Sequence, residues 1–340
     1  MTNLILCECF ARDGLQHEPQ VPDTATKLDL LGLFRRAGFR RIEATSYAHP
    51  ERVPGFADAS ELLAALPRAK GVWHKATCPN PRAIARAIAD QDAGHGAEEL
   101  SLLVSATESH TQRNLRSSRA GQWARVEEMA EMARGRFRLV GVISMALDCP
   151  FEGAVDPARV VEDAARFADL GAELVTIGDT IGSGTPTRVR ALFSRLLAEV
   201  PQIVPVAHFH DTRGTGLANC VAALEAGVSH FDSAMGGVGG HPTRISYGAG
   251  DTGNVATEDL VTLLEAEGLA HGIDMDAMMR ASEACEAALR RPLLSRVART
   301  GLWRASTDAA VVMGRKRRGV MAPGQCPGQH ACDAAGEYRP

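Results

Sequence analysis

Short apolar runs alternate with longer segments of helical period along this chain, and the alternation repeats eight times. The pattern is typical of parallel strands joined by crossover helices. Strands are predicted at Leu4–Cys9, Arg41–Thr45, Val72–Thr77, Leu100–Ser105, Arg138–Met145, Leu174–Ile177, Val204–His210 and His230–Ser233. Helices are predicted at Thr24–Ala37, Phe56–Leu66, Pro81–Asp90, Arg125–Ala133, Pro157–Leu170, Thr187–Val200, Leu217–Ala226 and Glu258–Glu267. Eight strand–helix repeats of ~30 residues each predict an α/β fold of the (β/α)8 TIM-barrel type.

Glycine follows three of the predicted helices, at Gly38, Gly171 and Gly227. A glycine there can adopt the left-handed conformation that ends a helix and turns the chain toward the next strand. No Gly-x-Gly-x-x-Gly follows the first predicted strand, which counts against an open dinucleotide-binding sheet. We therefore assign residues 1–270 to one barrel.

The strand pattern stops near residue 270. Met275–Arg290 predicts one more helix, so residues 271–310 are expected to form a helical extension of the barrel. Residues 311–340 are expected to form a flexible tail in which the basic run Arg315–Arg318 is solvated, with contact to ligand phosphates as the alternative. The cysteines of this tail match no standard zinc spacing.

Composition excludes several other classes of protein. Of 340 residues, 45% are hydrophobic and 23% are charged, which is ordinary for a globular protein with a large core. The formal net charge of -4 provides no basic field for nucleic acid. The longest apolar runs, such as Val204–Phe209, are far shorter than the roughly 20 residues of a membrane helix. The first residues lack the basic region of a signal peptide. We expect a cytoplasmic homodimer with reduced thiols that binds neither nucleic acid nor membranes.

Polar side chains follow or end most of the predicted strands. In a barrel of this type, catalytic groups come from the carboxyl ends of the strands. The residues at these places are Arg12, Asp13, Glu43, Ser105, Asp179, His208, His210 and Asn254.

His208-Phe209-His210-Asp211 is the sharpest local feature among them. Residues i and i+2 of a strand project to the same face, so both imidazoles can reach one divalent ion. Two hydrogen-bonded core histidines are the structural alternative. Asp13 and Asn254 favour the metal, because two nitrogens and two oxygens with open positions suit octahedral Mg²⁺ or Mn²⁺. The four glycines within Gly236–Gly240 are compatible with a phosphate contact or with a mobile active-site loop.

Four motifs carry a resemblance to a known family. They are Arg-Asp-Gly-Leu-Gln at 12–16, Gly-Asp-Thr-Ile-Gly at 178–182, His-Phe-His-Asp-Thr at 208–212 and Gly-Asn-Val-Ala-Thr-Glu-Asp-Leu at 253–260. Together they resemble the 3-hydroxy-3-methylglutaryl-CoA lyase branch of the metal-dependent aldolase-like barrels, over roughly residues 4 to 270. Leu15 favours this branch over the condensing relatives, the isopropylmalate and homocitrate synthases.

The resemblance implies a role for each site residue. It implies that Asp13, His208, His210 and Asn254 hold a divalent ion. Mg²⁺ or Mn²⁺ is the expected ion, and Zn²⁺ is a further candidate. It implies that Arg12 stabilises the enolate of the acetyl-CoA leaving fragment. Glu43 and Asp179 are expected in the same mouth, either as catalytic groups or as residues that orient their neighbours by hydrogen bonds. Gln16, Ser105 and Arg244 are expected to bind substrate.

One departure from the family stands out. The family's glycine loop ends in Gly-Gly-Cys-Pro, with the cysteine as an acid/base, whereas His241 holds that place here, between Gly240 and Pro242. Histidine can move a proton near neutral pH, so His241 is a candidate for this role. The segment 243–252 also looks longer than is usual and contains Arg244, and Val-Gly-Val at 140–142 stands where lyases commonly have Arg-Gly-Tyr.

The predicted function is carbon–carbon cleavage of a 3-hydroxyacyl-CoA, or a close analogue, by a metal-dependent retro-Claisen or retro-aldol route. One alternative is a synthase running the reverse reaction, or an aldolase acting on a 2-oxo acid. Another is a non-catalytic barrel that binds a metal and an acyl-CoA.

Overall fold

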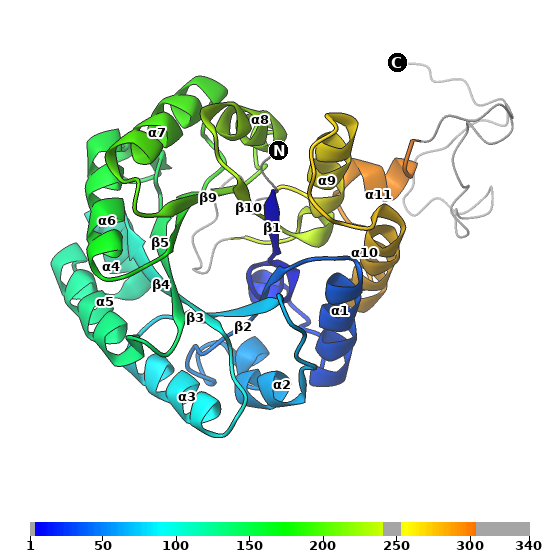
Figure 1. Ribbon diagram of the computed structural model, residues 1–340, viewed down its shortest axis with the longest axis horizontal. Coiled ribbons are helices and arrows are strands. Elements are labelled where there is room, and N and C mark those ends of the chain that lie inside the picture. The colour runs from blue at the N-terminus through cyan, green and yellow to red at the C-terminus, as the bar shows by residue number, and fades with distance from the viewer. Residues whose placement is uncertain (1–3, 241–252, 304–340) are drawn as a thin grey trace, which may run out of the picture. The chain divides into compact units, whose positions relative to one another are not determined.

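Eight parallel strands close into a barrel in this computed structural model, which describes residues 4–240 and 253–303. Their order around the barrel is β1-β10-β9-β8-β5-β4-β3-β2. The strands are β1 Ile5–Glu8, β2 Arg41–Ser46, β3 Trp73–Cys78, β4 Glu99–Ser105, β5 Arg138–Ser144, β8 Leu174–Asp179, β9 Val204–Phe209 and β10 His230–Ser233. Helices surround this barrel in Figure 1. The (β/α)8 prediction is confirmed, and each strand lies where the sequence placed it.

The helices that connect the strands form the outer layer. They are α1 Thr24–Arg36, α2 Ala59–Ala65, α3 Pro81–Asp92, α4 Glu108–Leu115, α5 Arg119–Ala133, α6 Pro157–Asp169, α7 Pro186–Glu199, α8 Gly216–Ala226 and α9 Thr257–Ala266. The predicted glycine stops at Gly38, Gly171 and Gly227 all have positive φ, between 86° and 103°. These glycines therefore end their helices as expected.

Two local predictions were wrong, and some short elements were not predicted. Helix α5 begins at Arg119 rather than Arg125, because the Ser118 side chain caps it by accepting from the N–H of Gly121. The segment predicted as Phe56–Leu66 is a short 3₁₀ turn followed by α2. Helix α4 and a small hairpin of β6 (Asp148–Cys149) and β7 (Gly153–Ala154) were not predicted, since both lie inside long connections.

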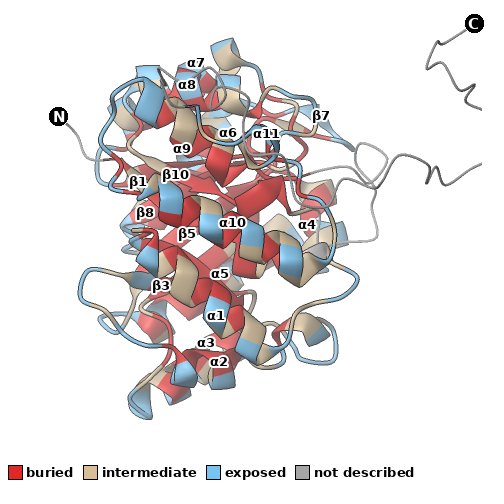
Figure 2. Ribbon diagram, turned by 90° about the vertical axis from the view of Figure 1, so that its right-hand side faces the viewer, coloured by how far each residue is buried: buried red, intermediate tan, exposed pale blue. Residues whose placement is uncertain are grey.

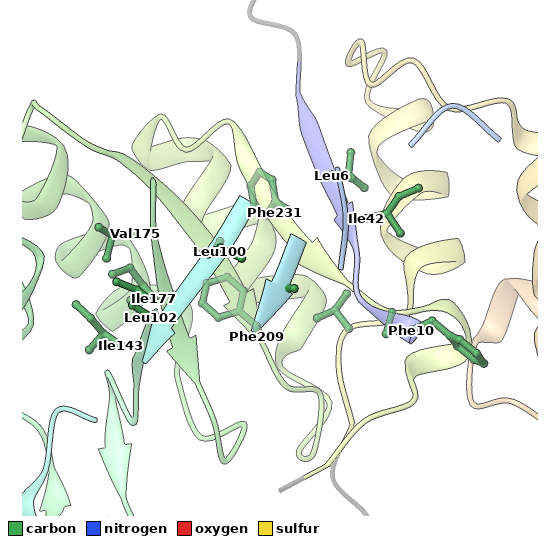
Figure 3. Packing of buried hydrophobic residues seen from close by; sticks show 14 of the residues in the cluster. Leu6, Phe10, Ile42, Leu100, Leu102, Ile143, Val175, Ile177, Phe209 and Phe231 are labelled. Atoms are coloured by element: carbon green, nitrogen blue, oxygen red, sulfur yellow. The ribbon is translucent and has the colours of Figure 1, made fainter. Parts of the chain in front are cut away.

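Most of the hydrophobic core lies between the barrel and its helices. Figure 2 shows the strands as buried and the outer helix faces as exposed. Side chains such as Leu102, Ile143 and Ile177 belong to this layer and are seen from close by in Figure 3. A separate small cluster of Val140, Leu174 and Val206 comes from the alternate positions of β5, β8 and β9. Apolar packing inside the barrel is therefore concentrated on these three strands.

The chain divides into two units between Arg299 and Thr300. Within the first unit, α10 (Met275–Leu289) packs against α1, and α11 (Arg296–Thr300) follows. The predicted boundaries at residues 270 and 310 remain predictions, and the basic run of the tail lies outside the described residues. The six cysteines in the described ranges are free and buried. No helix there combines the length and the apolar character required to cross a membrane.

Candidate active site

The turn after β1 holds Arg12 in a fixed position. The guanidinium donates from Nη1 to Asp13 Oδ1 at 2.7 Å and to Gln16 Oε1 at 3.2 Å. Its Nη2 forms an ion pair with Glu43 Oε1, also at 2.7 Å. Burial alone would lower the pKa of Arg12, but Glu43 and Asp13 outweigh it and raise that pKa. Arg12 is therefore a permanent, oriented cation at the carboxyl ends of β1 and β2.

His208 and His210 converge on one point beside Asp13. The two Nε2 atoms are 3.4 Å apart. One ligand atom from each of Asp13, His208 and His210 lies within 4.8 Å of the others. Burial alone would raise the pKa of Asp13, but Arg12 and the two histidines hold it well below its ordinary value. The i, i+2 spacing thus places both imidazoles on one face, as the sequence predicted.

Asn254 completes this group. Its Nδ2 donates to Asp13 Oδ2 at 2.7 Å and to the carbonyl oxygen of Val238 at 3.0 Å. Its Oδ1 is buried and has no hydrogen-bond partner in the described part of the chain. A buried amide oxygen without a donor fits a cation ligand. The residues present therefore fit a divalent ion with two nitrogen and two oxygen ligands.

The glycine loop packs directly on these residues. Gly239 has a φ of +136°, and a Cβ atom there would lie 2.3 Å from Nδ2 of Asn254. Gly236 donates its N–H to both carboxylate oxygens of Glu258, at 3.0 and 2.8 Å. Among residues 236–240 the glycines thus allow close packing over Asn254, a third use beside the two considered from the sequence. His241 and Arg244 lie outside the described residues.

Glu8 joins the two segments that carry the site. Its Oε1 accepts from the N–H of Phe10 at 2.9 Å and of Met235 at 3.0 Å. Its Oε2 lies 2.7 Å from the hydroxyl of Thr257. Complete burial raises the pKa of Glu8 to about 8. One side chain therefore fixes the turn before Arg12 to the start of the glycine loop.

Two charged residues behind the site were missed by the sequence analysis. Asp232 Oδ2 lies 3.3 Å from Nδ1 of His208, and the two residues are register partners on β10 and β9. Lys75 Nζ lies 3.6 Å from the same Asp232 oxygen and 3.5 Å from Glu43 Oε1. Both residues lie within strands rather than at the strand ends from which catalytic groups were expected. A charged residue within a strand predicted to be buried could have identified each of them from the sequence.

Asp179 and Ser105 have other surroundings. Asp179 accepts from the N–H groups of Ser183 and Gly184, at 3.1 and 2.8 Å, and burial raises its pKa. Ser105 is fully buried, and its hydroxyl lies 2.9 Å from Nδ1 of His110. These contacts support loop-shaping roles for both residues, and their predicted catalytic and substrate-binding roles stay predictions.

Comparisons of sequence and of structure with known proteins all find hydroxymethylglutaryl-CoA lyases or their family. A family model described as HMGL-like matches residues 3–285. Over 294 residues the chain is 37% identical to the mitochondrial hydroxymethylglutaryl-CoA lyase of Rattus norvegicus, covering 86% of this chain and 88% of that protein. It is 34% identical to the cytoplasmic 3-hydroxy-3-methylglutaryl-CoA lyase of Mus musculus, with 86% and 83% covered. The solved structure of an HMG-CoA lyase from Acinetobacter baumannii, in complex with coenzyme A and 3-methylmalate, superimposes with a TM-score of 0.82 at 34% identity, covering 88% of this chain and 95% of that one.

Proposed function

The chain belongs to the HMGL-like family and is a carbon–carbon lyase, and from this premise we propose that it cleaves a 3-hydroxyacyl-CoA to acetyl-CoA and an oxo acid. The observation that carries the proposal is the position of Arg12 beside three convergent ligand-type side chains. Arg12 contacts Asp13 at 2.7 Å, and Asp13 lies with His208 and His210 in one group. Side chains that fit a metal ion, beside an oriented cation, support carbon–carbon cleavage, because the ion would acidify the hydroxyl and the cation would stabilise the enolate.

Asp13, His208, His210 and Asn254 would hold the divalent ion, for which we propose Mg²⁺ or Mn²⁺. When bound, the ion would polarise the substrate's hydroxyl and carboxylate oxygens and so acidify the hydroxyl. The guanidinium of Arg12 would lie beside the thioester oxygen, where negative charge develops as the carbon–carbon bond breaks. Glu43 keeps that guanidinium in place through the 2.7 Å ion pair.

The reaction also moves two protons. A base takes the proton of the substrate hydroxyl, the electron pair of that O–H bond forms the new carbonyl, and the breaking carbon–carbon bond leaves the enolate of acetyl-CoA. The enolate carbon then takes up a proton to give acetyl-CoA. His241 is proposed for this proton transfer, because histidine occupies the place of the family's acid/base cysteine and can titrate near neutral pH.

The choice of substrate is part of the proposal. The relatives named above are hydroxymethylglutaryl-CoA lyases. His241, Arg244 and the segment 243–252 differ from the usual family pattern, so a thioester with a different or additional polar group is expected to be the better substrate. A cytoplasmic location and a homodimer are further predictions, and one of the relatives named above is itself a cytoplasmic enzyme.

A substrate screen tests the proposal. Purified protein would be stripped of metal with EDTA, reloaded with Mg²⁺ or Mn²⁺, and mixed with a panel of 3-hydroxyacyl-CoA thioesters that includes hydroxymethylglutaryl-CoA. Mass spectrometry would measure the release of acetyl-CoA. We expect this release only after metal is restored. Lack of metal-dependent release from every thioester, together with no binding of Mn²⁺, would refute the proposed function.

A further inference from the structure

Lys75 projects from β3 into the barrel, directly behind the site. Its side chain is 2% exposed, and its ammonium lies between two buried carboxylates, Glu43 at 3.5 Å and Asp232 at 3.6 Å. Each of these carboxylates contacts one residue of the proposed machinery: Glu43 contacts Arg12, and Asp232 contacts His208. Lys75 is therefore placed to act on both halves of the site at once.

The strands explain this position. Glu43 on β2 and Lys75 on β3 are register partners, and Asp232 on β10 is the partner of His208 on β9. Side chains at alternate positions of a barrel strand point inward. A lysine at this position of β3 thus meets carboxylates that come from two other strands.

The charge arrangement supports an ionised Lys75. Burial alone would lower the pKa of this lysine, but Asp232 and other nearby groups, Glu43 among them, outweigh burial and raise it. Lys75 and Arg41 in turn help to hold the pKa of Asp232 well below its ordinary value, against the effect of burial. Cys7, Cys9 and Asp232 also form a group with metal-ligand spacing. The ammonium of Lys75 contacts Asp232 of that group.

We propose that Lys75 is a positioning residue that holds Glu43 and Asp232, and through them the orientations of Arg12 and His208. The inference rests on the proposed roles of Arg12 and His208. Without the ammonium, two buried carboxylates lose a shared partner and must move, because an unpaired buried charge is strongly unfavourable. Groups that orient metal ligands typically affect metal affinity or activity by about 10- to 100-fold.

The test compares Lys75→Met with the native protein. Methionine keeps much of the side-chain volume and removes the charge. We expect kcat to fall ~10-fold or more with KM changed less than about threefold. We expect the Mn²⁺ dissociation constant, measured by electron paramagnetic resonance on protein without substrate, to rise ~10-fold. Simple removal of a nearby positive charge would instead tighten Mn²⁺ binding, so unchanged or tighter binding overturns the inference.

A double-mutant cycle locates the effect. If Lys75 acts through Glu43, Glu43→Gln costs less kcat in the Lys75→Met background than in the native one. Full additivity would overturn the link to Arg12. Lys75→Gln keeps hydrogen-bond donors without charge and carries the same test if Lys75→Met does not fold.

A matched control separates position from burial. Lys27 is another buried lysine, 3% exposed, whose ammonium binds Asp58 and the carbonyl oxygen of Gly55 away from the site. Lys27→Met should lower the melting temperature and leave kcat and Mn²⁺ affinity unchanged. If the native protein shows neither lyase activity nor Mn²⁺ binding, the proposed function is refuted. If the native protein is active and Lys75→Met has the same kcat and Mn²⁺ affinity, only the role of Lys75 is refuted.

Discussion

Replacing Glu8 by glutamine should change how the stability of the protein depends on pH. Glu8 is fully buried, and no lysine or arginine in the described ranges lies within ion-pair distance of it. Burial raises its pKa from 4.5 to about 8. The unfolded chain therefore releases this proton above pH 4.5, while the folded chain keeps it until about pH 8. Folding stability falls with rising pH across that window and is level beyond it.

The size of the effect follows from the shift. One pKa unit corresponds to about 1.4 kcal/mol, so Glu8 lowers the free energy of unfolding by at most about 5 kcal/mol across the whole window. Between pH 6 and pH 8 its share is about 2 to 3 kcal/mol. Glutamine does not titrate, and its geometry matches a protonated Glu8. Its Oε1 can accept from the N–H groups of Phe10 and Met235, and its amide can donate to the hydroxyl of Thr257.

Urea unfolding followed by circular dichroism at pH 6, 7 and 8, at constant ionic strength, measures this difference. We expect Glu8→Gln to gain about 2 to 3 kcal/mol relative to the native protein between pH 6 and pH 8. Glu98→Gln is the control. Burial alone would raise the pKa of Glu98, but hydrogen bonds from His74 lower it. The contribution of Glu98 to the free energy of unfolding is therefore complete above the pKa of the unfolded chain and is lost only as the pH falls below that value. Its difference from the native protein should stay constant over the same range. A constant difference for Glu8→Gln would show that Glu8 is ionised in the folded protein and would refute the reasoning.

Three further predictions concern the chemistry. His208→Ala or His210→Ala should abolish metal-dependent turnover and Mn²⁺ binding measured by calorimetry; full activity of the double variant would contradict the ligand set. Arg12→Lys keeps one charge but cannot meet both Asp13 and Glu43 at 2.7 Å, so steady-state kinetics should show kcat reduced ~100-fold; a raised KM with unchanged kcat would exclude a transition-state role. His241→Ala should be nearly inactive and His241→Cys should retain lyase activity, with the native pH–rate profile following a group at about pH 6–7; a fully active alanine variant would remove His241 from the proton transfer.

The fold could be predicted because each signal was local. Alternation of strands and helices fixes the barrel, and glycines such as Gly38 and Gly171 mark helix ends by their own conformation. The start of helix α5 could not be placed in the same way. Ser118 caps the helix well ahead of Arg125, where the start was predicted. A capping serine is not part of an apolar period, so periodicity alone placed the start too late.

The metal-ligand candidates were found from the sequence for a similar reason. His208 and His210 are two positions apart on one strand, so strand geometry alone places them together. Their contact with Asp13 required only that the carboxyl ends of β1 and β9 share one end of the barrel. Asn254 Oδ1 could not be identified as the free ligand atom, because that depends on where Nδ2 donates.

The residues behind the site depend on closure of the barrel, which no local pattern encodes. Lys75 meets Glu43 on the neighbouring strand and Asp232 across the junction between the first and last strands. Pairing of β1 with β10 closes the barrel, so charges that are far apart in sequence compensate one another in the folded protein. Val140, Leu174 and Val206 of β5, β8 and β9 fill another part of the interior with apolar side chains. Glu43 and Asp232 contact Arg12 and His208, and Lys75 contacts both carboxylates, so substitutions at these three interior positions should act on catalysis as strongly as on stability.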